Sequence, residues 1–474
     1  MTTPKPPIDA RPVSRQVTAD LLARHDLSGP RYTSYPTAVE FHEGFGVDDY
    51  EARLAQANTL GTDAPLSVYL HLPFCQERCL FCGCHVIIAK QHDVAVPYIE
   101  MLKREMDLVA ARLPNRRRFA QLHLGGGTPT YYAPAELTDL LKHFLSLFTP
   151  LPGAELAVEV DPRVTTTAHL DALADLGFNR VSMGVQDLTP QVQEAINRVQ
   201  TLEQTAALIA HARSRGFRGI NVDLIYGLPH QTPETFERTI EAVIALGIDR
   251  AAVYSFAFVP WVKGNQKKIE ETDLPAPAIK LRLFAIARER FLEAGYLPIG
   301  MDHFARPDDD LGRAKIEGRL RRNFQGYAVI PGDDVIGLGI SAIGDVRGAY
   351  VQNEKKLSTY AASIEAGTLP VVRGVARTAD DEVRRTVIHE LMCNFRIDTV
   401  EIGRHYGVDF ATYFADDLKL LAEQAREGLV RITPTLIEAT PTGELFVRNL
   451  AMCFDRYMRE KHAADSKPVF SRTV

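Results

Sequence analysis

Short apolar runs alternate with stretches of helical periodicity over the middle of the chain. Six runs, each about as long as a buried strand, lie at 67–72, 119–124, 155–160, 180–185, 219–227 and 251–256. Between the first two runs, apolar residues recur at intervals of three and four, as on the core-facing side of a helix: Ile99, Leu102, Met106 and Val109. The connections 134–148, 202–214 and 233–245 have the same periodicity. This alternation predicts an α/β fold with right-handed crossovers and a parallel sheet, either open and doubly wound or closed into a barrel.

Polar residues stand at or just past the ends of several apolar runs. Glu159, Gln186 and Asp223 are the examples. In parallel α/β folds, the carboxyl ends of the strands meet at one edge, where ligands bind. The sequence therefore predicts a functional site at this edge.

Both ends of the chain depart from the pattern. Residues 1–58 contain four early prolines and the segment RYTSYPT at 31–37, and we interpret them as an N-terminal arm that lies across another domain. After Tyr350 the alternation stops, and helical periodicity appears at 380–394 and 410–427. We expect an arm at 1–58, an α/β unit with an extension at 59–350, and a mainly helical C-terminal domain at 351–474.

Composition narrows the functional classes. The 474 residues, 46% of them hydrophobic and 24% charged, are typical of a folded protein with room for about three compact units. A net charge of −6 gives no overall attraction to nucleic acid or to anionic lipid. No run approaches the roughly 20 apolar residues of a membrane span, and the N-terminus lacks an apolar signal region. These features predict a cytoplasmic protein that binds neither membranes nor nucleic acid.

One C-terminal pattern raises DNA binding as an alternative. The stretch 428–452 resembles the hairpin and helix of a winged-helix domain. However, residues 401–474 contain 10 basic and 11 acidic side chains, with no basic stripe for phosphates. We interpret this part as a structural or lid domain.

Four of the six cysteines fall within ten residues, directly after the first predicted strand: Cys75, Cys79, Cys82 and Cys84. The spacing C-x3-C-x2-C suits an iron–sulfur cluster, whose irons can be reached by thiolates from one short loop. Structural zinc normally takes two ligand pairs separated by a dozen or more residues, whereas Cys393 and Cys453 are isolated. Unligated buried thiols are the remaining alternative.

The number of thiolate ligands decides the kind of cluster. Three thiolates leave one iron of a four-iron cluster open to a substrate or cofactor, whereas four close it for electron transfer only. Cys84 follows Cys82 by two residues, and this C-x-C pair would have to bend sharply to reach two corners of one cluster. We interpret Cys84 as a non-ligand near the site.

Several motifs together resemble a known family. The run YLHLPFCQERCLFCGCH at 69–85 resembles the cluster loop of radical S-adenosylmethionine (SAM) enzymes, and GGGTPT at 125–130 resembles their motif for the cofactor's amino group. With RYTSYPT, VEVDP at 158–162, GMDHFA at 300–305 and RNFQGY at 322–327, the sequence resembles the oxygen-independent coproporphyrinogen III oxidase family over nearly its whole length.

This resemblance implies both a fold and an activity. The fold is a partial (β/α)6 radical SAM barrel with a [4Fe–4S] cluster inside its top, on Cys75, Cys79 and Cys82. The activity is the oxidative decarboxylation of two propionates of coproporphyrinogen III to vinyl groups, which gives protoporphyrinogen IX in haem synthesis. It proceeds through a 5′-deoxyadenosyl radical made from SAM.

The resemblance also implies which residues bind the cofactor. Gly126, Gly127 and Thr128 belong to the glycine motif, whose bare backbone lets a ligand approach. Glu159 has two alternatives, a structural carboxylate or an acceptor for the ribose hydroxyls, and the resemblance favours the ribose. It further implies a second bound SAM and packing around the cofactors, with these contacts: Gln186, Arg198, Asp223, Phe81, Ala257, Ile343 and, beside the methionine end, Tyr69. Arg198 could instead belong to a solvated helix surface.

Other polar residues have no single interpretation. Arg319, Arg321 and Arg322 form a charge run, which is usually a solvated surface, but a tetracarboxylate substrate needs cations, and guanidinium pairs well with carboxylate. No catalytic residue is assigned, and these histidines are left without a role: His71, His85, His123, His230 and His303.

Two other functions were weighed. A haem chaperone related through the barrel typically lacks the fourth cysteine, the RYTSYPT arm and the RNFQGY segment, which this chain has. A plain electron carrier would need Cys84 as a fourth ligand. We therefore expect a monomeric enzyme whose partners are coproporphyrinogen III and a flavodoxin-type reducing system.

Overall fold

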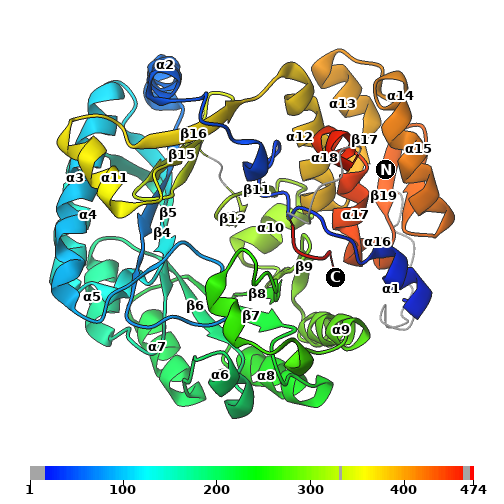
Figure 1. Ribbon diagram of the computed structural model, residues 1–474, viewed down its shortest axis with the longest axis horizontal. Coiled ribbons are helices and arrows are strands. Elements are labelled where there is room, and N and C mark those ends of the chain that lie inside the picture. The colour runs from blue at the N-terminus through cyan, green and yellow to red at the C-terminus, as the bar shows by residue number, and fades with distance from the viewer. Residues whose placement is uncertain (1–16, 330–331, 333, 463–469, 474) are drawn as a thin grey trace.

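The centre of the molecule is one large, mainly parallel sheet. The structure, a computed structural model, describes residues 17–329, 332, 334–462 and 470–473 (Figure 1). The six predicted runs form β1 (Leu66–Leu72), β4 (Arg118–Gly126), β5 (Thr149–Val160), β6 (Arg180–Gln186), β7 (Gly219–Tyr226) and β8 (Arg250–Ser255). They are parallel neighbours in this order, which confirms the prediction of a six-stranded α/β barrel unit.

The sheet extends beyond these six strands on both sides, to twelve strands. Beside β1 it adds β13 (Asp334–Leu338), which is parallel to β1, and then the antiparallel strands β14 (Ile343–Val346), β15 (Ala349–Asn353) and β16 (Val371–Ala376). Beside β8 it adds the antiparallel strands β10 (His303–Ala305) and β9 (Leu297–Ile299). Two of these strands, β15 and β16, run past residue 350, so the sheet continues where the sequence pattern had suggested an end. The division at 350 remains a prediction.

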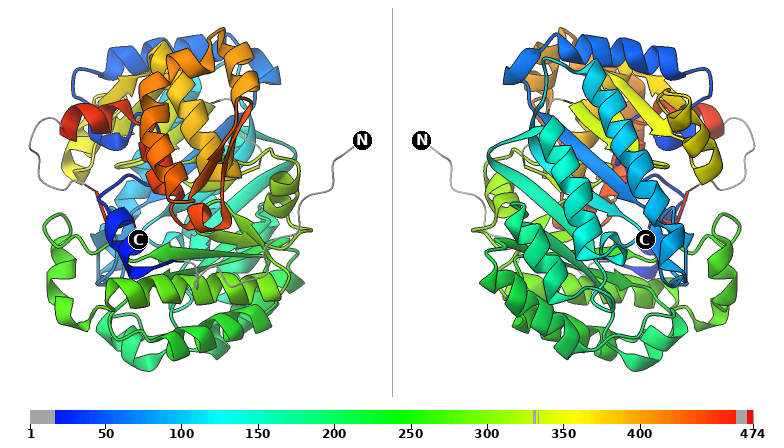
Figure 2. Two further views of the ribbon diagram at one scale, coloured as in Figure 1. Left: turned by 90° about the vertical axis from the view of Figure 1, so that its right-hand side faces the viewer. Right: turned by 90° about the vertical axis from the view of Figure 1, so that its left-hand side faces the viewer.

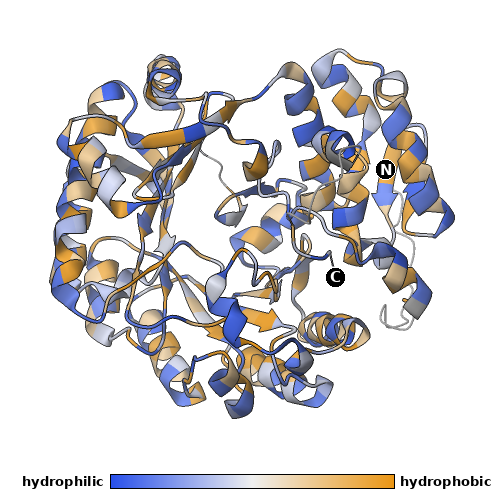
Figure 3. Cartoon of the chain, in the orientation of Figure 1, coloured by the Kyte–Doolittle hydropathy of each residue, from blue (hydrophilic) through white to orange (hydrophobic). Residues whose placement is uncertain are grey.

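Helices cover the outside of the curved sheet (Figures 1 and 2). They are α3 (Val96–Arg112), α4 (Pro134–Leu147), α5 (Thr167–Asp175), α6 (Pro190–Ala195), α7 (Leu202–Ser214), α8 (Pro233–Ala245) and α9 (Pro277–Glu293). On α3, the predicted core-facing residues Ile99, Leu102, Met106 and Val109 are all buried. Figure 3 shows hydrophilic and hydrophobic residues alternating around these helices, as expected where one side faces the sheet and the other faces water.

The C-terminal part is mainly helical and has its own apolar core. Its helices are α12 (Ala379–Asn394), α13 (Thr399–Tyr406), α14 (Phe410–Tyr413), α15 (Ala415–Arg426), α16 (Pro441–Leu445), α17 (Val447–Met452) and α18 (Arg456–His462). A small antiparallel sheet joins them, formed by β17 (Arg396–Asp398), β18 (Val430–Ile432) and β19 (Leu436–Ala439). The hairpin at 430–439 is the one that the sequence pattern had indicated.

The arm packs against this C-terminal core. Its helix α1 (Ala19–His25) and the side chains of Tyr32 and Tyr35 belong to the same apolar cluster as α12 and α17. The Tyr32 hydroxyl donates to Asp455 (2.9 Å), and the Tyr35 hydroxyl accepts from the backbone N–H of Arg456 (3.1 Å). The second helix, α2 (Val47–Asn58), lies against α3, β14 and β16. The prolines at 4, 6, 7 and 12 fall outside the described residues.

Candidate active site

The cysteine loop leaves the carboxyl end of β1 and lines a cavity of about 350 Å³. It runs between two short parallel strands, β2 (Phe74–Cys75) and β3 (Ile87–Ile88). Cys75, Cys79 and Cys82 all line this cavity, and Cys84 does too. Within the described residues, no three His, Cys, Asp or Glu side chains converge to hold a single metal ion. Three thiols that line one cavity can instead bind an iron–sulfur cluster, in which each thiolate binds a different iron.

The structure brings most of the other predicted site residues to the same cavity. These come from the cysteine loop, from strands β4 to β7 and the turn after β4, and from the segment after α6: Phe81, Gly126, Gly127, Thr128, Glu159, Gln186, Arg198 and Asp223. Thr128 lies closest to the thiols, with its hydroxyl 3.4 Å from the Cys75 Sγ. The thiols and the predicted cofactor-binding residues thus share one wall.

Three predicted residues lie outside that wall. Tyr69, on β1, hydrogen-bonds to His71 Nδ1 (3.0 Å) and stacks on His123. Ala257 follows β8, and its carbonyl accepts from Gln266 (3.0 Å). Ile343 begins β14 and lines a separate small cavity. Whether these three contact a cofactor stays a prediction.

Neighbouring atoms leave no room for a side chain at Gly126 and Gly127. Gly126 has a left-handed backbone (φ 106°), and a Cβ there would overlap the His71 ring. A Cβ on Gly127 would come within 2.5 Å of the Pro73 carbonyl. The backbone N–H of Gly127 donates to Leu72 (2.9 Å), so the motif is fixed directly to the start of the cysteine loop.

Glu159 is held as a carboxylate on the cavity wall. Its Oε1 lies 2.9 Å from His123 Nε2, and its Oε2 accepts from the backbone N–H of Gly126 (3.3 Å). Burial alone would raise the pKa of Glu159, but the hydrogen bond and charge of His123 outweigh it and lower that pKa. His123, left without a role by the sequence, therefore keeps Glu159 ionised and able to accept hydroxyl groups.

Asp223 lies on the neighbouring wall in a different electrostatic state. Burial first, and the nearby Glu159 second, raise the pKa of Asp223 to about 6. Ser182 and Asn221 donate to its two oxygens (2.9 and 2.8 Å). Asp223 can thus take up a proton much more easily than Glu159.

Arg198 is a buried part of the site, because only 7% of it is exposed, and the solvated-surface alternative does not hold. Its Nη1 donates to Asp161 (2.9 Å) and its Nη2 to the Gly184 carbonyl (2.6 Å). Its Nε is buried and has no partner among the described residues. A buried donor without a partner is costly, and Arg198 itself lines the cavity, where an anionic ligand could pair with its guanidinium group.

Two residues beside the cysteines were missed at the sequence level. Asp161 binds both Arg198 and Arg163, and Arg163 Nη2 lies 2.7 Å from its Oδ2. Both guanidinium groups lie 3.5 Å from the Cys79 Sγ. The signal was present, since Asp161 belongs to the VEVDP motif, but only Glu159 was singled out there.

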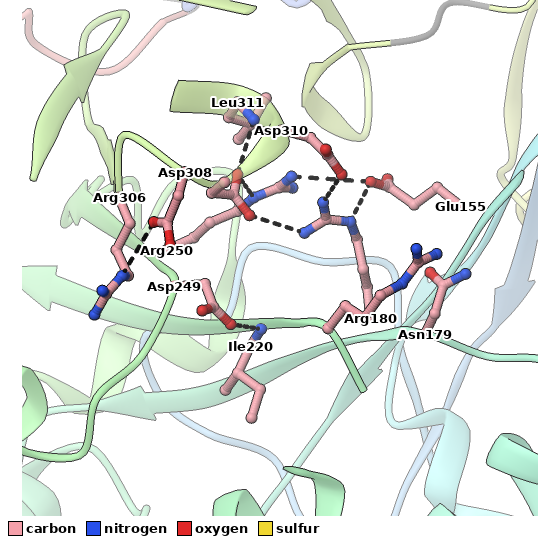
Figure 4. Close-up of polar contacts among 12 residues, drawn as sticks. Glu155, Asn179, Arg180, Ile220, Asp249, Arg250, Arg306, Asp308, Asp310 and Leu311 are labelled. Atoms are coloured by element: carbon pink, nitrogen blue, oxygen red, sulfur yellow. Dashed lines mark hydrogen bonds and ion pairs between the residues drawn. The ribbon is translucent and has the colours of Figure 1, made fainter. Parts of the chain in front are cut away.

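A second cavity, of about 110 Å³, lies deeper in the barrel and shares Glu159, Ser182 and Asp223 with the first. Arg180 on β6 closes its lower end by binding Glu155 on β5 (2.5 Å) and Asp310 (Figure 4). Arg250 on β8 binds Asp309 (2.6 Å), the N-cap of α10 (Asp310–Ile316). We call Glu155, Arg180, Arg250, Asp309 and Asp310 the floor cluster.

The three arginines of the charge run have different environments. Arg319 is exposed and pairs with Glu317, and Arg321 is exposed near Glu390. Arg322, on β11 (Arg321–Asn323), is 5% exposed, and both its Nε and Nη1 lack partners among the described residues. It stacks at 4.5 Å on the ring of Tyr327, on β12 (Gly326–Ala328), and this ring borders the deeper cavity.

Comparison with known proteins places the chain among related enzymes. Residues 69–243 match the radical SAM superfamily, and residues 378–446 match the HemN C-terminal domain. The oxygen-independent coproporphyrinogen III oxidase of Escherichia coli is 45% identical over 454 residues (96% of this chain, 98% of the relative), and that of Pseudomonas aeruginosa is 44% identical over 443 residues (93% and 96%). A solved structure of the Escherichia coli coproporphyrinogen III oxidase, described as a radical SAM enzyme, matches with a TM-score of 0.86 at 45% identity, over 90% of this chain and 97% of that one. The chain therefore belongs to the oxygen-independent coproporphyrinogen III oxidase family, within the radical SAM superfamily.

Proposed function

We propose that this protein converts two propionates of coproporphyrinogen III to vinyl groups by oxidative decarboxylation, without oxygen, and so forms protoporphyrinogen IX. The observation that carries the proposal is one cavity whose lining combines three thiols, a glycine motif, a carboxylate held ionised by histidine and a buried arginine. The near full-length similarity to enzymes named for this reaction supports the same substrate.

Membership of the superfamily brings a [4Fe–4S] cluster and SAM as cofactors. When bound, the cluster supplies an open iron and one electron for cleavage of SAM to a 5′-deoxyadenosyl radical. Cys75, Cys79 and Cys82 would hold the cluster. Arg163 and Arg198 each lie 3.5 Å from the Cys79 sulfur, so two guanidinium groups border the place where the cluster would be held.

The chain's own residues would bind and orient SAM. Gly126 and Gly127 present bare backbone to the amino acid part, and Glu159 accepts the ribose hydroxyls because His123 keeps it ionised. The guanidinium group of Arg198 suits a carboxylate, and Asp223, which lines the same cavity, can accept a hydrogen bond. These two residues, with Gln186, would serve a second SAM.

The substrate's carboxylates need cations, and Arg322 is the buried one of the three neighbouring arginines; it lines a separate small cavity and stacks on Tyr327, which lines the deeper barrel cavity. We assign it a substrate propionate, since its Nε and Nη1 are free to bind one. The floor cluster closes the opposite end of the barrel, which keeps bulk water from the reacting carbon.

A haem chaperone is the second candidate, and the structure disfavours it. The arm and the RNFQGY hairpin, which such proteins typically lack, are both built into this molecule: Tyr32 and Tyr35 are buried in the C-terminal core, and Arg322 and Tyr327 pair across β11 and β12.

The remaining partners and properties are also proposals. We infer a cytoplasmic monomer that receives electrons from a flavodoxin-type system and does not bind nucleic acid or membranes. None of the helices in the described part of the chain combines the length and apolarity that a membrane crossing requires.

The direct test is anaerobic incubation of the cluster-reconstituted protein with SAM, dithionite and coproporphyrinogen III. We expect one 5′-deoxyadenosine for each vinyl group, with the products oxidised to porphyrins and separated by chromatography. A Cys79→Ser protein is the control and should give neither. Release of 5′-deoxyadenosine without any vinyl product would contradict the assignment of the substrate.

A further inference from the structure

The segment 257–268, which follows β8 and includes the short helix η6 (Gly264–Lys268), exposes two adjacent large apolar residues. Trp261 is 63% exposed and Val262 is 61% exposed. Among the described residues, no other large apolar side chains with such exposure are adjacent in sequence. Trp261 is also the single tryptophan of the chain. Isolated exposed apolar residues are ordinary, but a tryptophan within an apolar pair is typical of an interaction surface.

Hydrogen bonds hold this segment against the outside of the cysteine loop. Asn265 Nδ2 donates to the carbonyls of Leu80 (2.8 Å) and Cys82 (3.1 Å), and Gln266 Nε2 donates to that of Phe81 (3.2 Å). Below these bonds, Leu80 and Phe81 pack against Ile269 in a small apolar cluster. Trp261 and Val262 are therefore exposed on a segment fixed to the loop that carries the three thiols.

The same segment is positively charged. It contains Lys263, Lys267 and Lys268 and no acidic residue, in a chain with a net charge of −6. Further cations gather at the end of the cysteine loop. The pKa of His85 is lowered mainly by burial, with contributions from the charges of Lys263, Lys355 and Arg78. Exposed acidic residues follow only after the segment, at Glu270 and Glu271. An exposed apolar pair on a segment with three lysines is complementary to an acidic protein that has an apolar contact surface.

We propose that Trp261 and Val262, with Lys263, Lys267 and Lys268, form the docking surface for the protein that reduces the cluster. This inference rests on the proposed function, because each cleavage of SAM consumes one electron. The partner is a small acidic electron carrier with a one-electron cofactor, either a flavin or an iron–sulfur cluster. In the docked complex the carrier is oxidised by one electron and the cluster of this chain is reduced by one, and no bond is made or broken.

The first test separates docking from catalysis by comparing two reductants. Trp261→Ser/Val262→Ser and Lys267→Glu/Lys268→Glu proteins are assayed for SAM cleavage, once with dithionite and once with a reduced flavodoxin. We expect the flavodoxin-supported rate at limiting carrier to fall about tenfold or more, since interface tryptophans and charges each contribute on this scale. The dithionite-supported rate should stay the same, because dithionite needs no docking surface.

Two matched controls lie far along the chain from the segment. Ile316→Ser removes another apolar side chain, 69% exposed on α10, and Lys419→Glu reverses a lysine whose side chain is 76% exposed on α15. Both should behave as the unaltered protein with either reductant. If the flavodoxin-supported rate is equally high in all variants, or if the dithionite-supported rate falls with it, the docking surface is wrong.

Binding provides a readout that does not depend on turnover. Trp261 emission reports on this surface alone, so an acidic carrier that lacks tryptophan should change it in a saturable way that weakens with added salt. Calorimetric titration should show about tenfold weaker binding for Lys267→Glu/Lys268→Glu. Emission that responds to anionic vesicles but not to the carrier would overturn the proposal. A protein that binds the carrier but makes no vinyl product would instead contradict the proposed function.

Discussion

Two carboxylates on one face of β5, Glu155 and Glu159, show how the two ends of the barrel differ. Glu155 lies in the floor cluster, where Arg180 and Arg250 lower its pKa against the effect of burial, and Gln121 donates to it (2.9 Å). Glu159 lies four residues further along β5. Its hydrogen-bond partners among the described residues are His123 and one backbone N–H, and 40% of its side chain is exposed. The floor cluster pairs most of its charges within itself, whereas the end of the barrel with the cysteine loop leaves hydrogen-bonding capacity for a ligand.

The arginines repeat this difference. Arg180, in the floor cluster, pairs with Glu155, Asp309 and Asp310. Arg198, at the cluster end, pairs with Asp161 but keeps a buried Nε without a partner among the described residues. Arg250 in the floor cluster also has a buried Nη2 without a hydrogen-bond partner among the described residues, but this atom lies 3.9 Å from Glu155. The difference between the two ends is therefore the number of carboxylates around each arginine, three for Arg180 and one for Arg198.

Replacing a cysteine of the loop should have the largest effect of all, namely loss of the iron–sulfur cluster, and should leave the rest of the fold unchanged. Cys79→Ser should abolish the [4Fe–4S] cluster, because one of its three ligands is lost, while the far-ultraviolet circular dichroism stays unchanged. Cys84→Ser is the matched control and should keep the iron content and the spectrum of the reduced cluster. A Cys84→Ser protein that cannot hold four irons would show that Cys84 is a ligand.

Breaking the floor cluster should cost stability rather than ligand binding. Arg180→Met leaves Glu155, Asp309 and Asp310 with fewer cations, and breaking such a buried pair typically costs about 3–5 kcal/mol. The free energy of unfolding in urea measures this loss. Arg218 is an exposed arginine that lines a third cavity together with Arg180 and Asp310. Arg218→Met is the control and should change the free energy of unfolding little. Equal stability of both variants would mean that the floor cluster contributes nothing to the fold.

The paired variants of β5 test the comparison most directly. Glu159→Ala should weaken SAM binding to the reconstituted protein by about 1–3 kcal/mol, the usual contribution of charge-assisted hydrogen bonds. Glu155→Ala should leave that affinity unchanged and lower stability instead. Anaerobic calorimetric titration gives both affinities. If Glu159→Ala binds SAM as tightly as the unaltered protein, Glu159 has a structural role only.

The sequence predicted this molecule best where the signal is local. The six long strands have apolar runs of their own, and the cysteine loop and glycine motif are short segments with characteristic spacing. The short edge strands β13 to β16 have four to six residues each, too few to show a clear period. The floor cluster was not foreseen, because Arg180 and Asp309 are 129 residues apart and nothing in either local sequence indicates the pairing.

The arm illustrates an intermediate case. Its composition correctly indicated that it gains order by packing on another part of the chain. It could not show that Tyr32 and Tyr35 enter the C-terminal core, since their partners Asp455 and Arg456 follow more than 400 residues later. The arm also reaches the barrel, because Arg31 pairs with Asp302, the neighbour of His303 in the lining of the deeper cavity.

A third carboxylate, Glu105 on α3, is held in a different way from both Glu155 and Glu159. It is 1% exposed and accepts from the Tyr360 hydroxyl (2.6 Å), the Asn353 amide (2.6 Å) and the Gly339 backbone N–H (2.7 Å). All three donors are neutral, so burial dominates and raises the pKa of Glu105 to about 7. The floor holds its buried carboxylates with cations, whereas this one is held with neutral groups.

The last effect we expect is a pH dependence of stability that comes from Glu105. Its pKa is higher in the folded state than the usual value of 4.5, so the folded protein binds more protons between about 4.5 and 7. The stability contributed by the protonated carboxyl is complete below this window and is lost as the pH rises through it. Glu105→Gln cannot ionise, so the stability of the unaltered protein relative to this variant should fall from pH about 5 to pH about 8. Urea unfolding at the two pH values measures the change, with Glu100→Gln, an exposed position on the same helix, as the control whose difference stays constant. A difference for Glu105→Gln that is equally constant would mean that Glu105 is ionised throughout and that its three neutral donors suffice to hold a buried charge.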